Sequence, residues 1–366
     1  MNSSDDYGLS PKKETRVIAP PAVDYLPPRS KRYSPKIGLI GAGKISEYHL
    51  KNYRECGYDV AAIASRKLSD AESRRDEFYP SAEVYDDYQA LLSRDDIEVV
   101  DITPHPEDRL PILRDAIQAG KHVLSQKPFV LDLAVGADLV RLAADKGVKL
   151  AVNQNGRWAP HFSYMRGAIA GGLIGDVTSI DFSLQWDQTW IAGNEALEAI
   201  EHLILFDFGI HWFDIAQSMM GDQRAESVFA VTTRFDQQCY RPAAIASAVI
   251  QYPNSQVRMS FHGHTRLGEE DVSTAVGTKG TLRSRGPSLN EQPVMQVFLP
   301  EGSCNVPLTG SWFESGFQGA MGELLCAIEE NRDPIHSGKD NLRSLELCYA
   351  AMRSADKNEV VKIESK

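Results

Sequence analysis

Residues 36–46, KIGLIGAGKIS, decide the fold of this chain. Lys36–Ile40 is a short apolar run, typical of a buried parallel strand, and a glycine follows it at once. Gly41 permits a tight turn, Gly43 lets the backbone approach a pyrophosphate, and Ser46 takes the third position of G-x-G-x-x-G, which needs a small residue. At the start of a strand–helix series, this loop predicts a dinucleotide site. The alternative is a glycine turn without a ligand.

The stretch that follows alternates between strand and helix patterns up to about residue 155. Apolar runs predict strands at 58–64, 99–103, 122–124 and 150–152. Helices are expected from a capping box at Ser69–Glu72, up to Ala119, and from 132 to 146. This order is that of βαβ units, so we predict a Rossmann dinucleotide-binding domain with a parallel sheet over residues 36–155.

Residues 156–366 have a different spacing of apolar and polar residues, which predicts a substrate-binding and oligomerisation α/β domain. Longer segments of alternating polarity predict a large open, mainly antiparallel sheet, at 177–186, 226–235, 244–252, 256–264 and 271–283. Helical patterns close the chain at 315–330 and 341–355, and we expect the last one to pack back on the N-terminal domain. A sheet covered on one face leaves a surface for a homodimer or homotetramer.

Composition narrows the classes of partner. The 366 residues carry a net charge of −11 and lack a Lys/Arg-rich block, which argues against nucleic acid and anionic membrane. The first residues have neither the layout of a signal peptide nor an apolar span, so a cytoplasmic protein is expected. Five cysteines without a Cys-x-x-Cys pair indicate reduced thiols. Residues 1–35, polar and proline-bearing, predict an extended or disordered arm, or one that wraps a neighbouring subunit.

The end of the second strand predicts the choice of cofactor. A carboxylate there would bind the ribose 2′-hydroxyl of NAD, but the chain has Ser65, Arg66 and Lys67, and Asp59 stands at the other end of the strand. A hydroxyl and two cations suit a 2′-phosphate, which favours NADP, with NAD as the alternative. The same residues could also form a solvated basic turn.

Several motifs together resemble the Gfo/Idh/MocA oxidoreductases, the family of glucose–fructose oxidoreductase and inositol dehydrogenase, from about Lys36 to Ile363. They are Gly41–Ser46, Thr103-Pro104, Gly120–Leu124, Gln126-Lys127-Pro128, Arg157-Trp158-x-Pro160, Asp207-x-Gly209-x-His211-x-x-Asp214 and Gly277–Thr281. The resemblance implies a Rossmann domain, an open-sheet domain, and reversible hydride transfer between NAD(P) and a sugar or cyclic polyol. Family members usually carry glutamate where this chain has Gln126, a departure that bears on contacts to the nicotinamide ribose and on the lysine.

Three residues are predicted to be catalytic: Lys127, Asp207 and His211. Oxidation of an alcohol needs a base for the hydroxyl proton, and a lysine at the carboxyl end of a buried strand can serve. Asp207 and His211 lie four residues apart, so within a helix over 205–220 they would share a face and could relay a proton or hold a hydroxyl. The alternatives are a surface lysine, a helix ion pair, or a metal site that includes Asp214; we predict no metal.

Further residues are assigned to ligand binding. The substrate is expected to contact Asn155, Arg157 and Trp158 beside the catalytic residues, although Arg157 could equally form a structural ion pair and each of Trp158, Trp186, Trp190 and Trp212 could be core instead of a sugar-stacking ring. The cofactor is expected at Gly41, Gly43, Lys44, Ile45, Ser65, Arg66, Thr103, Pro104, His105, Gln126 and Lys127.

The sequence therefore predicts an NAD(P)-dependent dehydrogenase or reductase that acts on CH–OH groups of a small sugar or polyol. Two other functions remain open. One is a sensor that binds the dinucleotide without turnover, although it would not need Lys127, Asp207 and His211 together. The other is NAD-assisted glycoside hydrolysis, which would release sugar with no net change in NADH.

Overall fold

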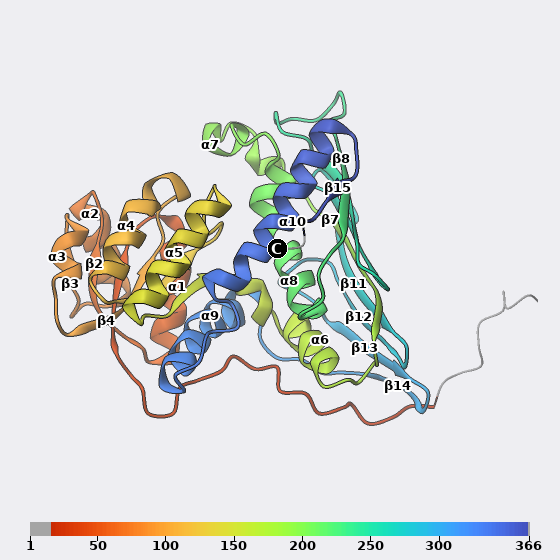
Figure 1. Cartoon of the computed structure of the whole chain (residues 1–366), viewed down its shortest axis with the longest axis horizontal. Coiled ribbons are helices and arrows are strands. Elements are labelled where there is room, and N and C mark those ends of the chain that lie inside the picture. Colours follow the sequence, from red (N-terminus) through yellow and green to blue (C-terminus); the bar gives the residue numbers. More distant parts are fainter. Residues whose placement is uncertain (1–15, 365–366) are drawn as a thin grey trace, which may run out of the picture.

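The computed structural model describes residues 16–364 and forms two sheets with helices between them (Figure 1). The first sheet has the strand order β3-β2-β1-β4-β5-β6, and all of its pairs are parallel. Its elements are β1 (Lys36–Ile40), α1 (Lys44–Cys56), β2 (Asp59–Ala64), α2 (Leu68–Phe78), β3 (Glu83–Tyr85), α3 (Tyr88–Leu92), β4 (Ile97–Ile102), α4 (Pro106–Gln118), β5 (His122–Gln126), α5 (Leu133–Lys146) and β6 (Leu150–Asn153). The predicted Rossmann domain is confirmed.

The second sheet is large and mostly antiparallel, as predicted, with the order β14-β13-β12-β11-β7-β10-β9-β8-β15. One pair, β7 with β10, is parallel. The strands are β7 (Val177–Gln185), β8 (Ser227–Thr233), β9 (Ile245–Gln251), β10 (Gln256–His262), β11 (Glu270–Gly277), β12 (Thr281–Gly286), β13 (Val294–Leu299), β14 (Gly302–Asn305) and β15 (Val361–Lys362).

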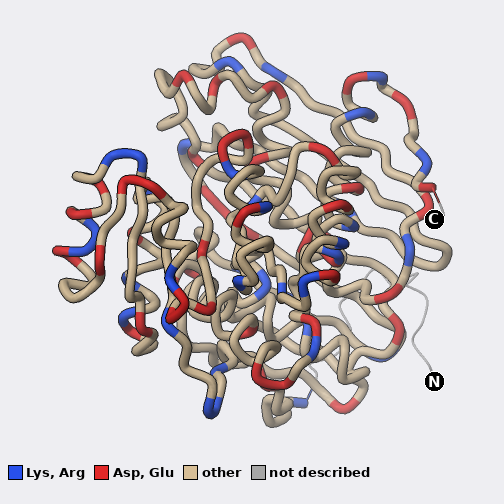
Figure 2. The backbone as a smooth tube through the Cα atoms, turned by 60° about the vertical axis from the view of Figure 1, so that its left-hand side comes forward, with Lys and Arg blue, Asp and Glu red and all other residues tan. Residues whose placement is uncertain are grey.

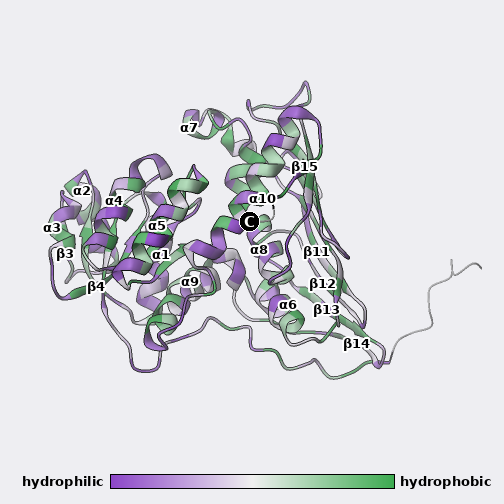
Figure 3. Ribbon diagram, in the orientation of Figure 1, coloured by the Kyte–Doolittle hydropathy of each residue, from purple (hydrophilic) through white to green (hydrophobic). Residues whose placement is uncertain are grey.

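The helices of the second half lie between the two sheets (Figure 1). They are the 3₁₀ turns η1 (Asn155–Trp158) and η2 (Thr189–Ile191), the π-helical turn η3 (Ile204–Phe208), α6 (Pro160–Ala170), α7 (Glu195–Glu198), α8 (Ile210–Met220), α9 (Trp312–Glu329) and α10 (Gly338–Lys357). Purple and green segments alternate along these helices in Figure 3, as expected for helices that bury one face.

Several local expectations differ from the structure. The segment 271–283 is a hairpin, because Gly277 ends β11 and the turn to β12 contains Gly280. Helix α2 begins at Leu68, and its N-cap is Lys67 without a side-chain hydrogen bond, so the predicted capping box does not form. The short β3, α3 and β14 were not expected, because their three to five residues mix polar and apolar types without a recognisable period.

The last helices return to the first domain. The apolar face of α9 packs on the Rossmann sheet, where Met321 and Leu324 share a core with Leu39 and Val99. Helix α10 lies against α5, and the Tyr349 hydroxyl donates to the Val130 carbonyl at 2.7 Å. The contacts of α9 and α10 thus connect the two domains, in addition to the chain segment that leaves the first sheet after β6.

Residues 16–34 form an extended strap that runs beneath both domains (Figure 1). At one end the Ile18 amide donates to the Ser303 carbonyl of β14 at 3.1 Å. Farther along, the Tyr164 hydroxyl of α6 donates to the Pro21 carbonyl at 2.9 Å. The described part of the predicted arm therefore lies on its own chain, and residues 1–15 lie outside the described residues.

The other end of the strap is held by one carboxylate. Three consecutive backbone N–H groups of residues 31–33 donate to Glu329, the last residue of α9, at 2.9, 2.6 and 3.0 Å. These backbone hydrogen bonds lower the pKa of Glu329. The strap thereby connects the edge of the second sheet to the junction of α9 with the Rossmann domain.

Lys and Arg residues are interspersed with Asp and Glu along the described backbone (Figure 2). Within residues 16–364, no helix combines the length and the apolar composition that crossing a membrane requires.

Candidate active site

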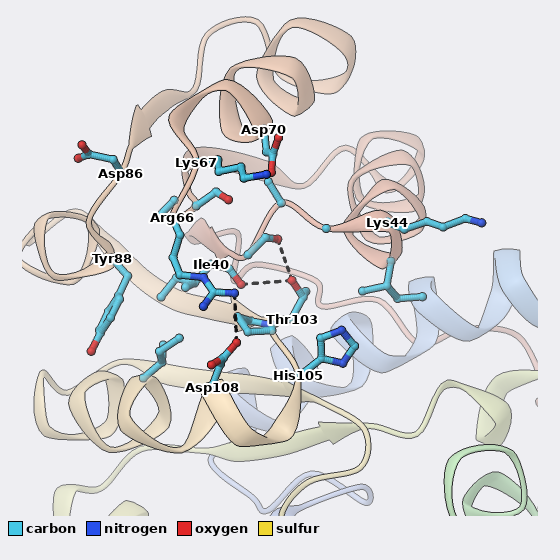
Figure 4. Close-up of a pocket in the computed structure, with 18 of the residues that line it drawn as sticks. Ile40, Lys44, Arg66, Lys67, Asp70, Asp86, Tyr88, Thr103, His105 and Asp108 are labelled. Carbon is cyan, nitrogen blue, oxygen red and sulfur yellow. Dashed lines mark hydrogen bonds and ion pairs between the residues drawn. The ribbon is translucent and has the colours of Figure 1, made fainter. Parts of the chain in front are cut away.

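A cavity of about 810 Å³ opens at the carboxyl ends of β1, β2 and β4. Open α/β sheets bind ligands at this edge, where loops from neighbouring strands meet. The cavity is lined by residues that the sequence assigns to the cofactor: Gly41, Gly43, Lys44, Ile45, Ser65, Arg66, Thr103, Pro104 and His105. Most of them appear in Figure 4, where the side chain of Lys44 points away from Thr103 and Arg66.

The glycine loop has the geometry that a phosphate group requires. Gly41 has a φ of +102°, and a Cβ there would lie 2.6 Å from the Thr103 hydroxyl oxygen. Gly43 is the N-cap of α1, and a Cβ there would meet nothing within 4 Å. The first backbone N–H groups of α1 are therefore open to an anion. Ser46 is buried, and its hydroxyl donates to the Gly43 carbonyl at 2.6 Å, so a serine fits the third glycine position.

Charges of both signs line the far end of the cavity (Figure 4). Ser65, Arg66 and Lys67 follow β2, as predicted. The Arg66 guanidinium lies 3.2 Å from the Asp108 carboxylate of α4, and its side chain is 86% exposed. Asp70 and Asp86 line the same cavity, and sequence reasoning did not place these three acids there. Arg66 is thus free to leave a weak surface ion pair for a stronger anion.

Lys127 follows β5 and contacts the second domain. Its ammonium donates to the Asp207 backbone carbonyl at 2.8 Å and lies 3.1 Å from the Asp207 carboxylate. The side chains of Lys127 and Asp207 are 18% and 24% exposed. Behind the lysine, the Gln126 side-chain oxygen accepts the Lys127 backbone N–H at 2.7 Å. Lys127 therefore stands at the junction of the two domains, partly accessible to solvent.

Asp207 and His211 come from a helix that is interrupted between them. Residues 204–208 form a π-helical turn, and α8 begins at Ile210, so the expected continuous helix over 205–220 is divided at Gly209. Single π-turns are frequent at functional sites. Burial, together with the charge of Lys127, holds the pKa of His211 well below its usual value, and no described residue partners its buried Nδ1. His211 is a neutral imidazole close to Lys127.

Arg157 occupies a buried ion-pair network instead of an open pocket. Its guanidinium binds both oxygens of Asp214 at 2.6 and 2.8 Å and one oxygen of Asp340 at 2.5 Å. Asp214 also accepts from Asn341 and Ser344. The structure thus realises the structural interpretation of Arg157, which engages both carboxylate oxygens of Asp214.

The tryptophans separate into core and surface residues. Trp158, Trp186 and Trp212 are 2%, 7% and 1% exposed. Trp190 is 60% exposed and packs edge-on against Phe208, the neighbour of Asp207. Among the four, Trp190 alone presents a large ring surface. Asn155, in the same turn as Trp158, is buried, and its side-chain oxygen has no partner among residues 16–364.

Sequence reasoning missed a buried arginine that joins the two loops of the site. Arg109 of α4 is fully buried and donates to the carbonyls of Pro104 and Pro128. Burial lowers its pKa to about 9. The signal was present in the sequence, because Arg109 shares the apolar face of a helix with Ile112, Leu113 and Ala116. An arginine on such a face indicates a specific buried contact.

The fold and the site define a dinucleotide-binding oxidoreductase, and comparison with known families agrees. The model of the oxidoreductase family with NAD-binding Rossmann fold, GFO/IDH/MocA, matches residues 35–154, and that of its C-terminal domain matches residues 162–283. The chain belongs to this family and is an NAD(P)-dependent oxidoreductase.

Characterised relatives share most of the length of the chain. A D-apiose dehydrogenase of Paraburkholderia graminis is 28% identical over 90% of each chain, and an inositol 2-dehydrogenase of Rhizobium meliloti is 23% identical over 89% of this chain and 98% of its own. Among solved structures, an Agrobacterium radiobacter oxidoreductase in complex with NAD+, L-tartaric acid and magnesium has a TM-score of 0.81 at 23% identity, covering 90% of this chain and 98% of its own.

Proposed function

We propose that this protein transfers a hydride reversibly between NADP and a hydroxyl-bearing carbon of a sugar or cyclic polyol, with Lys127 as general acid–base. One observation carries the proposal: the Lys127 ammonium stands at the cavity-side edge of the Rossmann sheet, 3.1 Å from the Asp207 carboxylate, with the neutral imidazole of His211 nearby. A protein that only binds the dinucleotide as a sensor, without turnover, would not need a lysine, a carboxylate and an imidazole together.

The residues of the cavity fit a nicotinamide dinucleotide. The open space at Gly43 and the free N-terminus of α1 suit the pyrophosphate, and Thr103, Pro104 and His105 line the path from this loop toward Lys127. When bound, the cofactor supplies the ring carbon that accepts or returns the hydride. Gln126, which the sequence assigns to the cofactor, is buried behind Lys127 and does not line the cavity.

The chain's own residues handle the proton. In oxidation, the Lys127 amine takes the hydroxyl proton while the C–H bond gives up its hydride and a C=O bond forms; in reduction, the ammonium returns the proton. His211, being neutral, can donate to or accept from the same hydroxyl and so orient it. Asp207 holds the lysine through its carboxylate and its backbone carbonyl.

The substrate class is inferred from the relatives and from the polar groups of the site. The named relatives act on apiose and inositol, and a Lactobacillus casei structure of similar fold is titled scyllo-inositol dehydrogenase with NAD(H) and scyllo-inositol. Asn155 offers a buried oxygen without a partner among the described residues, and Trp190 offers an exposed ring that can cover a sugar face. Arg157 and Trp158, which the sequence assigns to the substrate, are buried beside Asn155 in the chain.

NADP is the proposed cofactor because Ser65, Arg66 and Lys67 line the cavity where a ribose 2′-phosphate would lie. A phosphate would compete with Asp108 for Arg66, and a doubly charged, bidentate acceptor makes the stronger contact. The structures of NAD-bound relatives leave NAD as the alternative.

The experiment that tests this function is a spectrophotometric assay of NADPH and NADH formation and consumption across aldoses, ketoses, inositols and uronates. We expect turnover with at least one polyol or sugar and a preference for the phosphorylated cofactor. Sugar release without a net change in NADH would contradict it, as would tight cofactor binding without turnover on every member of the panel.

We also propose that the protein is a homodimer or homotetramer formed through the outer face of its large sheet. Phe229 and Val231 of β8 are 36% and 38% exposed on that face. Large apolar side chains exposed close together are typical of a surface that contacts another protein. Light scattering at micromolar concentration tests the assembly, and a monomeric mass would contradict it.

A further inference from the structure

Beneath Lys127, five buried side chains from four elements form one hydrogen-bonded network. His49 lies in the middle of α1, and its Nδ1 is 2.6 Å from an oxygen of Asp101 on β4. The Tyr53 hydroxyl donates to the same oxygen at 2.7 Å. On the other side of the imidazole, Nε2 faces Gln126 of β5 and Asn153 of β6. His49, Asp101 and Tyr53 have no exposed surface.

One contact settles the direction of every hydrogen bond in this network. The Lys127 backbone N–H can only donate, and it lies 2.7 Å from Gln126 Oε1, so this oxygen faces the lysine. The NH₂ group of Gln126 therefore faces His49 Nε2, at 3.5 Å. The Asn153 NH₂ group approaches the same nitrogen at 3.2 Å and Gln126 Oε1 at 3.3 Å.

The protonation state of His49 follows from these directions. Amide NH₂ groups only donate, so Nε2 must be an acceptor and carries no proton. Nδ1 must carry one, because it faces the Asp101 carboxylate. Phe317 of α9 packs on the imidazole with a centroid distance of 4.7 Å and closes the network to solvent. His49 is thus a neutral Nδ1–H imidazole that bridges a carboxylate and an amide.

We propose that His49, held by Asp101, is a positioning residue for Lys127. The imidazole fixes the amide of Gln126 in the orientation that presents Oε1 to the Lys127 N–H, and this hydrogen bond sets where the lysine backbone leaves β5. The lysine side chain then reaches Asp207 in the other domain. The inference rests on the proposed acid–base role of Lys127 for its catalytic consequence, but its geometric content can be measured separately.

The first test reads the tautomer of His49 in the unmodified protein. Nitrogen-15 chemical shifts of labelled histidine should report that His49 carries its proton on Nδ1 and none on Nε2. In Gln126→Glu, an acceptor would face Nε2, so this nitrogen should carry a proton in the variant. An Nε2–H tautomer in the wild type, or an unchanged Nε2 in Gln126→Glu, would overturn the proposal.

The second test measures where Lys127 lies, without a substrate. Reductive methylation followed by peptide mass spectrometry gives the labelling rate of Lys127, with Lys36, paired to Asp96 on the surface, as the internal reference. His49→Leu should raise the Lys127 rate several-fold, because the ammonium is held less firmly against Asp207. His161→Leu, which removes another fully buried imidazole, should leave the rate unchanged. Equal Lys127 rates in His49→Leu and wild type would overturn the proposal.

Two further variants separate positioning from a general loss of packing. His49 and Gln126 act in one chain of contacts, so Gln126→Ala should add little to the effect of His49→Leu, whereas independent effects would add. His49→Gln keeps an acceptor for the Gln126 amide and should return the labelling rate toward wild type. Additive effects, or no recovery in His49→Gln, would count against the proposal.

The kinetic consequence distinguishes this inference from the proposed function. On the substrate that the panel identifies, His49→Leu should lower kcat by about tenfold or more, as expected for a displaced catalytic group, and leave NADPH binding unchanged. Should Lys127→Met retain full kcat, the acid–base role fails, while the tautomer and labelling results still decide whether His49 positions the lysine. A His49→Leu enzyme with wild-type kcat beside an inactive Lys127→Met would overturn the positioning role alone.

Discussion

The cavity at the glycine loop and the proposed catalytic cluster of Lys127, Asp207 and His211 share one edge of the Rossmann sheet but are assembled in different ways. The cavity is lined by residues between Ile40 and Ile112, from consecutive strand–helix units of one domain. The cluster joins Lys127 to Asp207, 80 residues farther along the chain and in the other domain. The cavity is therefore complete once the first domain folds, whereas the cluster exists only after the second domain docks.

The two regions also differ in how firmly they hold their charges. Arg66 is 86% exposed and pairs with a half-exposed carboxylate, so its pairing energy is screened by water. Lys127 is 18% exposed and makes two contacts to one residue. We therefore expect substitutions in the cluster to have larger effects than substitutions at the rim of the cavity.

The largest effect is expected at Lys127. Lys127→Met should lower kcat/KM by about 10²–10⁴, the usual contribution of general acid–base catalysis, and leave NADPH affinity unchanged because the glycine loop is untouched. Steady-state kinetics and fluorescence titration measure the two quantities. Lys146→Met, at an exposed lysine at the end of α5, is the control. Turnover within about threefold of wild type would show that the lysine is not the acid–base group.

A second prediction extends the comparison to buried carboxylates. In the Rossmann sheet Asp101 is paired with His49 and Tyr53, whereas Asp271 of β11 is buried with neither oxygen bonded to any residue within 16–364. Burial raises the pKa of Asp271 to about 7 from 3.8. The folded protein then binds this proton more tightly than the unfolded chain, so stability falls as the pH rises from about 4 to about 7.

Asp271→Asn, which imitates the protonated acid, should therefore stabilise the protein at pH 8 by up to about 4 kcal/mol and have little effect at pH 4. Denaturant unfolding at both pH values measures the difference. Asp222→Asn, at an exposed carboxylate, is the matched control. Equal effects of Asp271→Asn at the two pH values would show that the carboxyl is not held neutral.

At the rim of the cavity, Arg66→Ala should weaken NADPH binding by about tenfold to a hundredfold, since a charge-assisted contact contributes about 1.5–3 kcal/mol. NADH affinity should stay nearly constant, because NADH lacks the 2′-phosphate. Arg75→Ala, at a partly exposed arginine of α2 paired with Asp76, controls for the loss of a surface charge. Wild-type preference for NADH, or equal losses for both cofactors, would contradict the assignment.

The smallest effect is expected at the strap. Glu329→Gln keeps the shape of the side chain but weakens three hydrogen bonds to backbone N–H groups, so the Tm should fall slightly at neutral pH. Because the folded-state pKa of Glu329 is lowered, its contribution is present above its ordinary pKa and lost as the pH falls through the folded value. The Tm difference should shrink in acid; a difference that is constant with pH would contradict this.

Much of the first domain could be predicted because its signals are local. The strand Lys36–Ile40 and the helix that Gly147 ends are found at the predicted residues, since glycine and apolar runs act over a few neighbours. The residues around the glycine loop gather in one cavity for the same reason. Asp70, Asp86 and Asp108 were missed, because only the sheet order β3-β2-β1-β4 brings them beside Arg66.

The sequence could name the members of the proposed catalytic cluster, but it could not predict their geometry. The motif around Asp207 and His211 marked the residues, yet the π-turn depends on packing that a helical pattern does not reveal. Arg157 illustrates the limit most clearly: a single arginine suits a ligand or an ion pair equally well, and only the approach of α8 and α10 decides between them. His49 and Gln126 are 77 residues apart in the chain, so no periodic pattern in the sequence predicts that their side chains are in contact.

The strap has a consequence for the order of events during synthesis. Its anchor at Lys31 and its acceptor at Glu329 are separated by 298 residues, so this end of the strap cannot be held until α9 has been made. At about 5–20 residues per second, this interval is on the order of tens of seconds. The Rossmann strands can pair in that time, and the strap can meet α6 and β14, but the backbone N–H groups of residues 31–33 still lack their acceptor. The backbone N–H groups of residues 31–33 are thus among the last of the described groups to find their partners.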